Sequence, residues 1–220
     1  MTDQDAAGHG GAVPVLRIGA VAVCPGVLLA PMEGVTDAPF RVICRRLGAA
    51  IVYSEFVNAE GLIRDDPAAP GRALRKLRFH PEERPFAVQL YGASPAAMSR
   101  AAAVAAAAAP DLLDVNCGCW VGDVALRGAG AGLLRDLAAM RAVVAAVVRA
   151  TDLPVTVKTR LGWDAASICI VEVARMLRPS WGRARSAMKS ARQAVAHRRQ
   201  ITGPVISNDC TLPMDRWSIR

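Results

Sequence analysis

Short apolar runs alternate with helical patterns along most of this 220-residue chain. Five of these runs, each next to a glycine, a proline or another turn residue, predict strands at 27–30, 50–56, 86–91, 112–116 and 155–159. We interpret runs such as Val155-Thr-Val157 as near-continuous apolar strands. This pattern is typical of parallel sheets, because helices cover both of their faces.

Helical patterns fill most of the segments between these runs. Asp37 is a suitable N-cap for a helix that we expect to end near Leu47, before a glycine. Ser94 precedes a proline and an alanine-rich helix that Pro110 ends. The same type of pattern predicts helices over 133–150 and 165–177.

Five βα units in succession predict an α/β fold of the TIM-barrel type, because parallel strands need a crossover between them. Eight such units close a barrel, so five units describe an incomplete (β/α) repeat. We expect residues 1–26 to be an N-terminal lead, with 1–13 disordered, and residues 27–177 to form the partial barrel domain. Beyond 177 the pattern fails, since residues 178–220 form a basic tail in which only 203–207 resembles a strand.

The composition indicates in which cellular environment the chain is expected to fold. No run of about eighteen apolar residues is free of charged and turn residues, and no basic segment precedes an apolar one at the N-terminus. We therefore expect neither a membrane span nor a secretory signal. Six cysteines without the spacing of a small disulfide scaffold favour a reducing, cytoplasmic setting. A single Cys-x-Cys pair and three dispersed histidines are a weak pattern for zinc, so no metal is expected.

Charge is distributed unevenly along the chain. Residues 178–220 hold nine of the 27 basic and two of the 19 acidic residues, so they supply +7 of the net charge of +8. A basic face across the whole domain, which nucleic-acid binding favours, is therefore not indicated. Arg72, Arg75, Lys76 and Arg78 form a local basic cluster that suits either a phosphate contact or a solvated loop.

Polar and reactive side chains gather after the fourth predicted strand, in Asp114-Val-Asn-Cys-Gly-Cys-Trp120. The carboxyl ends of barrel strands are where TIM-type barrels place their active sites. Five further motifs accompany this one: Leu29-Ala-Pro-Met-Glu-Gly-Val-Thr-Asp37, Ser54-Glu-Phe-Val57, Ala87-Val-Gln-Leu-Tyr-Gly92, Gly128-Ala-Gly-Ala-Gly-Leu-Leu134 and Val157-Lys-Thr-Arg-Leu-Gly-Trp-Asp164. In this order and at this spacing, the chain from Val27 to Asp164 resembles the tRNA-dihydrouridine synthases, flavin enzymes that reduce uridine in tRNA.

The resemblance implies tRNA as the substrate and a role for three residues near it. Cys119 would be the general acid that protonates C5 of the uracil while a hydride reaches C6. A thiol suits this role because its reference pKa of about 8.5 leaves it protonated but labile at neutral pH. Asn116 would orient the base or the loop, and Arg160 would contact the substrate. The uracil would leave the tRNA stack to reach such a pocket.

The resemblance also implies FMN as the cofactor, with NADPH as the reductant. Pro31, Met32 and Glu33 would lie against the flavin ring, and the Gln89 amide would bond its heteroatoms. Lys158 would stabilise the negative charge of the reduced flavin. A lysine within an apolar strand is costly to bury without such a partner.

Each of these roles has an alternative that the sequence leaves open. Pro31 and Met32 are compatible with an ordinary turn, and Gln89 with a buried glutamine whose hydrogen bonds stay within the protein. Arg160 suits an ion pair with Asp114 or Glu55 equally well. Cys117 and Cys119 are also compatible with a structural pair. The glycines of 128–132 resemble a phosphate loop, but no Lys-Ser/Thr pair follows them, and a turn into the next helix is a sufficient interpretation.

Three departures from the family pattern bear on activity. Trp120 stands where the family has a proline, and Gly122 and Asp123 stand where basic residues are usual. The family's His-Gly-Arg-Thr-Arg segment, its two phosphate-binding strand ends and its C-terminal helical tRNA domain have no match. The alternative hypothesis is therefore a truncated or frameshifted, non-catalytic remnant of the family that at most binds RNA.

Overall fold

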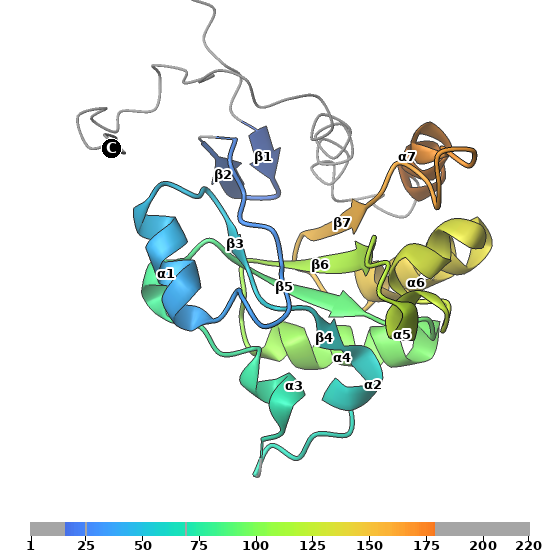
Figure 1. The fold of residues 1–220 in the computed structure, drawn as a ribbon. Helices are drawn as coiled ribbons and strands as arrows, with labels where there is room; N and C mark the ends of the chain where they lie inside the picture. Colours follow the sequence, from blue (N-terminus) through green and yellow to red (C-terminus); the bar gives the residue numbers. More distant parts are fainter. Residues whose placement is uncertain (1–15, 25, 69, 179–220) are drawn as a thin grey trace, which may run out of the picture.

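A parallel sheet forms the centre of the computed structural model, which describes residues 16–24, 26–68 and 70–178 (Figure 1). Strands β3, β5, β6 and β7 lie side by side in that order, and β4 also pairs with β5. Their bounds are Val52–Tyr53 (β3), Val57–Asn58 (β4), Phe86–Tyr91 (β5), Leu112–Cys117 (β6) and Val155–Thr159 (β7). Every pairing in this sheet is parallel, so the carboxyl ends of its strands lie along one edge.

Helices alternate with these strands along the chain. The α-helices are α1 (Ala38–Arg46), α2 (Ala59–Leu62), α3 (Arg72–Arg75), α4 (Pro95–Ala107), α5 (Gly122–Ala125), α6 (Leu137–Arg149) and α7 (Ile170–Leu177). The 3₁₀-helices η1 (Pro81–Glu83) and η2 (Gly130–Arg135) complete the connections in the described part of the chain. Successive βα units around a parallel sheet confirm the predicted α/β fold, an incomplete TIM-type barrel.

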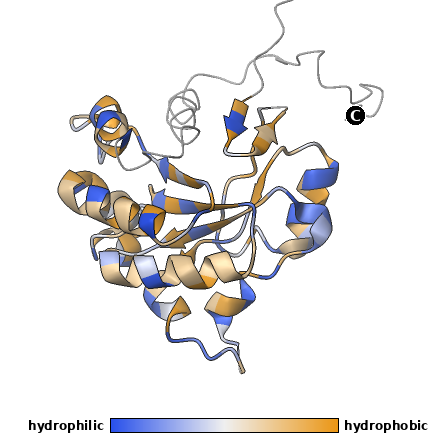
Figure 2. Cartoon of the chain, turned by 180° about the vertical axis from the view of Figure 1, so that it is seen from behind, coloured by the Kyte–Doolittle hydropathy of each residue, from blue (hydrophilic) through white to orange (hydrophobic). Residues whose placement is uncertain are grey.

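The sheet is covered on both faces. On its outer face, Val88, Leu90 and Val115 pack with the buried side of α4, where small residues such as Ala101 and Ala105 let the helix approach closely. Figure 2 shows the apolar residues along the strands and the mostly apolar α4. The inner face carries a smaller apolar cluster, to which a hairpin of β1 (Leu16–Ile18) and β2 (Val21–Val23) contributes. Figure 1 shows this hairpin on the side of the sheet opposite α4.

The predicted strands agree with the structure in part. The bounds of 86–91 and 155–159 are confirmed, and the strand predicted over 112–116 extends by one residue to Cys117. The strand predicted over 27–30 is wrong, because this segment makes only an isolated bridge between Leu28 and Ile51. The strand predicted over 50–56 divides into β3 and β4, because the Ser54 side chain, not a backbone carbonyl, accepts the Gln89 N–H bond at 3.1 Å.

Two predicted helix starts are wrong. The helix predicted from residue 133 begins at Leu137, because Asp136 caps it by accepting from the Ala139 N–H at 2.9 Å. The helix predicted from residue 165 begins at Ile170, because Asp164 accepts from the N–H groups that follow it and closes a turn instead. The N-caps predicted at positions 37 and 94 are confirmed.

The hairpin was not predicted from the sequence. Residues 16–23, within the expected N-terminal lead, pair through Leu16 and Val23, and Gly19 turns between them with φ of 60°. The expected disordered residues 1–13 lie outside the described residues. So do 179–220, which include nearly all of the expected basic tail and the candidate strand at 203–207.

Candidate active site

Three of the predicted site residues meet on the inner face of the sheet. Strand pairing places Gln89 of β5 opposite Asp114 of β6, and Asn116 of β6 opposite Lys158 of β7. Side chains alternate between the faces of a strand, so Gln89, Asp114, Asn116, Thr156 and Lys158 share the inner face. The register therefore brings Gln89, Asn116 and Lys158 onto one face of the sheet, together with Asp114 and Thr156, which were not predicted as site residues.

A chain of hydrogen bonds links these side chains to the loop that carries Cys119. Asn116 Oδ1 accepts from the backbone N–H groups of Gly118 at 3.0 Å and Cys119 at 2.9 Å. Asn116 Nδ2 donates to Gln89 Oε1 at 3.0 Å, and Gln89 Nε2 donates to Asp114 Oδ2 at 2.6 Å. The Thr156 hydroxyl donates to Asp114 Oδ1. The described contacts of Asn116 are therefore to the loop and to Gln89.

Asp114 lies at the buried end of this chain and is 2% exposed. Burial raises the pKa of its carboxyl group to about 6, although the hydrogen bonds from Gln89 and Thr156 and the positive charge of Lys158 act in the opposite direction. A carboxylate without a hydrogen-bonded cation is an uncommon component of a protein interior. The sequence motif contained Asp114, but only as a possible ion-pair partner of Arg160.

The loop around Cys119 is held from two sides. Its N–H group is bonded to Asn116, and its carbonyl oxygen accepts from the Ala131 N–H at 2.8 Å. Gly130 of η2, with φ of 55°, approaches so closely that an added Cβ would lie 2.6 Å from that carbonyl oxygen. The glycine-rich segment therefore supports the thiol-bearing loop and turns into the next helix, as the alternative interpretation expected.

The two cysteines of the motif differ in access. Cys117 is fully buried against the outer core, and burial, with a smaller contribution from Asp114, raises the pKa of its thiol. Cys119 is half-buried, and both of these thiols are free. Of the two, Cys119 is the thiol that a ligand at the carboxyl edge can reach.

Lys158 and Arg160 are exposed at the end of β7. Lys158 is one residue before the end of β7 and is exposed, so water can solvate its ammonium group and burial does not require a partner for it. The alternative ion pair of Arg160 is absent among the described residues. Glu55 instead accepts from the Gly34 N–H at 2.5 Å, and Asp114 is bonded to neutral side chains.

Pro31, Met32 and Glu33 lie in the turn before α1, and their polar groups are engaged within the protein. The Met32 N–H and carbonyl bond the Thr36 side chain at 3.1 and 3.0 Å. Both Glu33 carboxylate oxygens accept from Lys76 Nζ at 2.6 Å, and Oε1 also accepts from Arg72 at 2.7 Å. Two members of the predicted basic cluster are thus paired with Glu33, which weakens its interpretation as a phosphate site.

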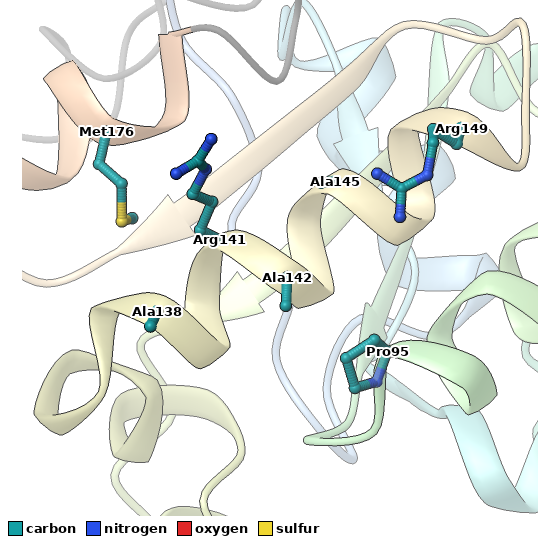
Figure 3. A pocket seen from close by; sticks show the side chains of 7 residues that line it. All are labelled: Pro95, Ala138, Arg141, Ala142, Ala145, Arg149 and Met176. Carbon is teal, nitrogen blue, oxygen red and sulfur yellow. The ribbon is translucent and has the colours of Figure 1, made fainter.

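A groove on the other side of the sheet is separate from this site. Figure 3 shows it along α6, from Arg141, which lies near Met176 of α7, to Arg149 at the other end, with Pro95 beside the helix. It contains none of the predicted site residues.

Within the described ranges, no three His, Cys, Asp or Glu side chains come together to hold a metal. No helix in these ranges is long and apolar enough to cross a membrane.

Comparison with known proteins decides the family. The family model described as dihydrouridine synthase matches residues 28–180, which is more than half of the chain. The chain belongs to the dihydrouridine synthase family. The matched residues contain all six of the sequence motifs, so the resemblance inferred from the sequence is confirmed.

Relatives in the dihydrouridine synthase family are longer than this chain. The tRNA-dihydrouridine synthase B of Pseudomonas aeruginosa is 40% identical over 162 residues, which cover 74% of this chain and 48% of that protein. The probable tRNA-dihydrouridine synthase 1 of Synechocystis is 38% identical over 207 residues, covering 88% of this chain and 56% of its own length. The chain therefore spans about half the length of the curated relatives that it matches.

Proposed function

We propose that this chain takes part in the reduction of uridine to 5,6-dihydrouridine in tRNA, as an FMN-dependent tRNA-dihydrouridine synthase with NADPH as the reductant. The observation that carries the proposal is the half-buried Cys119 thiol at the carboxyl edge of the sheet. Its backbone is fixed by Asn116 and by Ala131. A fixed acid beside a binding surface is what protonation of a planar base requires.

The residues near this edge fit a flavin ring in part. Lys158 offers an exposed ammonium group that can stabilise negative charge on a reduced ring, and Pro31 and Met32 offer half-buried apolar surface. Gln89 fits less well, because it is fully buried and, among the described residues, its amide bonds Asp114 and Asn116. Glu33 fits a different role, since its bonds to Lys76 and Arg72 tie the turn before α1 to α3.

When bound, FMN supplies the hydride for C6 of the uracil. The residues of the chain supply the remaining parts. The Cys119 thiol donates its proton to C5, and Asn116 holds the N–H groups of the thiol-bearing loop so that the Sγ atom keeps its place. Arg160, exposed and without an ion-pair partner among the described residues, is available for a phosphate of the tRNA.

The test compares two variants of the full chain. Cys119→Ala is expected to keep the flavin absorbance of the purified protein and to leave tRNA from a deletion strain without dihydrouridine, measured by mass spectrometry of nucleosides. Cys169→Ala removes another half-buried free thiol outside the site and is expected to keep both properties. A wild-type chain that purifies without flavin, does not take up added FMN and leaves tRNA unmodified would reject the proposal.

A non-catalytic, RNA-binding role is the second candidate. Loss of catalysis is favoured by the engagement of Glu33 with Lys76 and Arg72 and of Gln89 with Asp114, because these candidate flavin contacts already have protein partners. Retention of tRNA by the chain in a filter-binding assay, together with absence of flavin, would support this role over the first.

A further inference from the structure

Asp114 has no role in the proposed chemistry, yet it occupies the centre of the inner face. It lies in register with Gln89 on one side and with Thr156 on the other. The three side chains are at most 2% exposed, so water does not compete for their hydrogen bonds. The row therefore forms a buried connection between strands β5, β6 and β7.

The chemistry of the two ends fixes the direction of the whole chain of hydrogen bonds. A carboxylate only accepts hydrogen bonds, so Gln89 must present its Nε2 to Asp114. Gln89 Oε1 then faces Asn116 and requires the Nδ2 of that residue. Asn116 Oδ1 is left facing the loop, where the Gly118 and Cys119 N–H groups can only donate. If Asn116 were turned over, its own N–H groups would face two other donors.

We propose that Asp114 is a positioning residue that anchors the buried end of this chain of hydrogen bonds, keeps the Gln89 and Asn116 amides in place and so holds the backbone that carries Cys119. Thr156 assists by bonding the second carboxylate oxygen. The inference rests on the proposed function, because it assigns Asp114 to the geometry of the candidate catalytic thiol.

Stability of the fold does not account for an aspartate at this position. Its hydrogen-bonded side-chain partners, Gln89 and Thr156, are neutral, and Lys158 is exposed at the strand end. Replacing a buried charged group by a well-packed apolar residue is often neutral or stabilising for a fold. A leucine among the neighbouring apolar residues of β6 would serve the core, but it would remove the acceptor that holds Gln89 Nε2 and so one of the two ends that fix the chain of hydrogen bonds.

The test measures the loop directly and does not depend on activity. In Asp114→Leu, the Gly118 and Cys119 amide protons are expected to exchange with solvent about tenfold faster than in the wild type, as loss of a net hydrogen bond predicts. Alkylation of Cys119, located by peptide mass spectrometry, is expected to change in rate as well. Asp114→Asn keeps one acceptor oxygen and is expected to restore most of the protection.

Two further variants complete the design. Thr159→Val removes a hydroxyl that bonds the Cys117 carbonyl at 3.1 Å at the same sheet edge, but it leaves the amide chain intact and is expected to keep wild-type exchange in the loop. Gln89→Met cuts the chain while Asp114 stays in place, so it is expected to reproduce the effect of Asp114→Leu if the leucine variant does not fold.

The outcomes separate this inference from the proposed function. Wild-type exchange at Gly118 and Cys119 in a folded Asp114→Leu or Gln89→Met variant would overturn the positioning role. Faster exchange in a chain that binds no flavin would keep the positioning role and reject the enzymatic proposal. In an active chain, Asp114→Leu is expected to lower kcat for dihydrouridine formation at unchanged KM for tRNA, because the loop geometry changes and the tRNA contacts do not.

Discussion

Replacing Asp114 with asparagine is expected to remove most of a pH dependence that burial of the carboxyl group gives to the fold. Burial raises its pKa from 3.8 to about 6. A carboxyl group with a raised pKa favours the folded state below its unfolded pKa, and this contribution is lost as the pH rises through the folded pKa. The shift of about 2 units corresponds to about 3 kcal/mol, at about 1.4 kcal/mol per unit.

The neighbouring groups leave this window to Asp114. Tyr53 of β3 and Cys117 of β6 both have a pKa raised by burial, so both stay neutral between pH 4 and pH 7. Lys158 of β7 is the nearby cation, and its charge lowers the pKa of Asp114. An aspartate-to-asparagine change therefore removes the buried titration without introducing another.

Urea unfolding followed by circular dichroism at pH 4, 5, 6 and 7 measures the effect. The free energy of unfolding of the wild type is expected to fall by about 2 kcal/mol relative to that of Asp114→Asn between pH 4 and pH 7, because part of the full effect lies below pH 4, where the carboxyl group of the unfolded chain titrates. Titrations elsewhere in the chain cancel in this difference. Parallel pH profiles for the two proteins would refute the reasoning, because they would show that Asp114 titrates alike in the folded and unfolded chains.

The remaining predictions concern the loop and the core, and both are measured by urea unfolding. Gly130→Ala is expected to destabilise the fold by about 1–3 kcal/mol, because the added Cβ would lie 2.6 Å from the Cys119 carbonyl oxygen at a positive φ. Gly122→Ala, whose nearest contact would be 3.8 Å away, is the control and is expected to be tolerated. Met98→Ala is expected to lower the free energy of unfolding by about 2–5 kcal/mol, because this side chain of α4 is fully buried. Leu126→Ala, at 79% exposure, is expected to stay within about 0.5 kcal/mol.

The elements that the sequence predicted well carry strong local signals. Strand β5 follows Pro85 and is apolar at all positions but Gln89, and strand β7 follows Pro154 and begins with Val155-Thr-Val157. Asp37 and Ser94 have a side-chain oxygen and a proline placed for an N-cap. Such signals lie within a few residues of the element that they predict, so they can be recognised in one sequence without knowledge of the tertiary structure.

The misses have a different physical origin. Strands β1 and β2 have three residues each, too few for a periodic pattern, and they are stabilised by burying Ile18 and Val23 on the inner face. The helix that begins at Leu137 follows an apolar 3₁₀ segment whose sequence pattern also predicts an α-helix. The Asp136 cap is the only local signal of the true start.

The site was predicted where the motif itself placed polar side chains at a strand end. Asn116 and Cys119 were proposed in this way, whereas Lys158 was proposed from the family resemblance, and the register places Asn116 beside Lys158. The contacts of Asp114 with Gln89 and Thr156 were not, because they depend on how three strands distant in sequence align. A polar residue in an apolar strand was the only signal, and it did not specify a partner.

The polar row across β5, β6 and β7 also bears on how the sheet selects its alignment. Parallel strands rich in valine, leucine and alanine offer little chemical difference between one alignment and the next. A slip of β6 by one residue would turn Asp114 into the layer that faces α4 and α6, and would leave the Gln89 amide opposite a hydrocarbon. The same side chains therefore help to specify the strand register, because they disfavour shifted sheets that the apolar residues alone would tolerate.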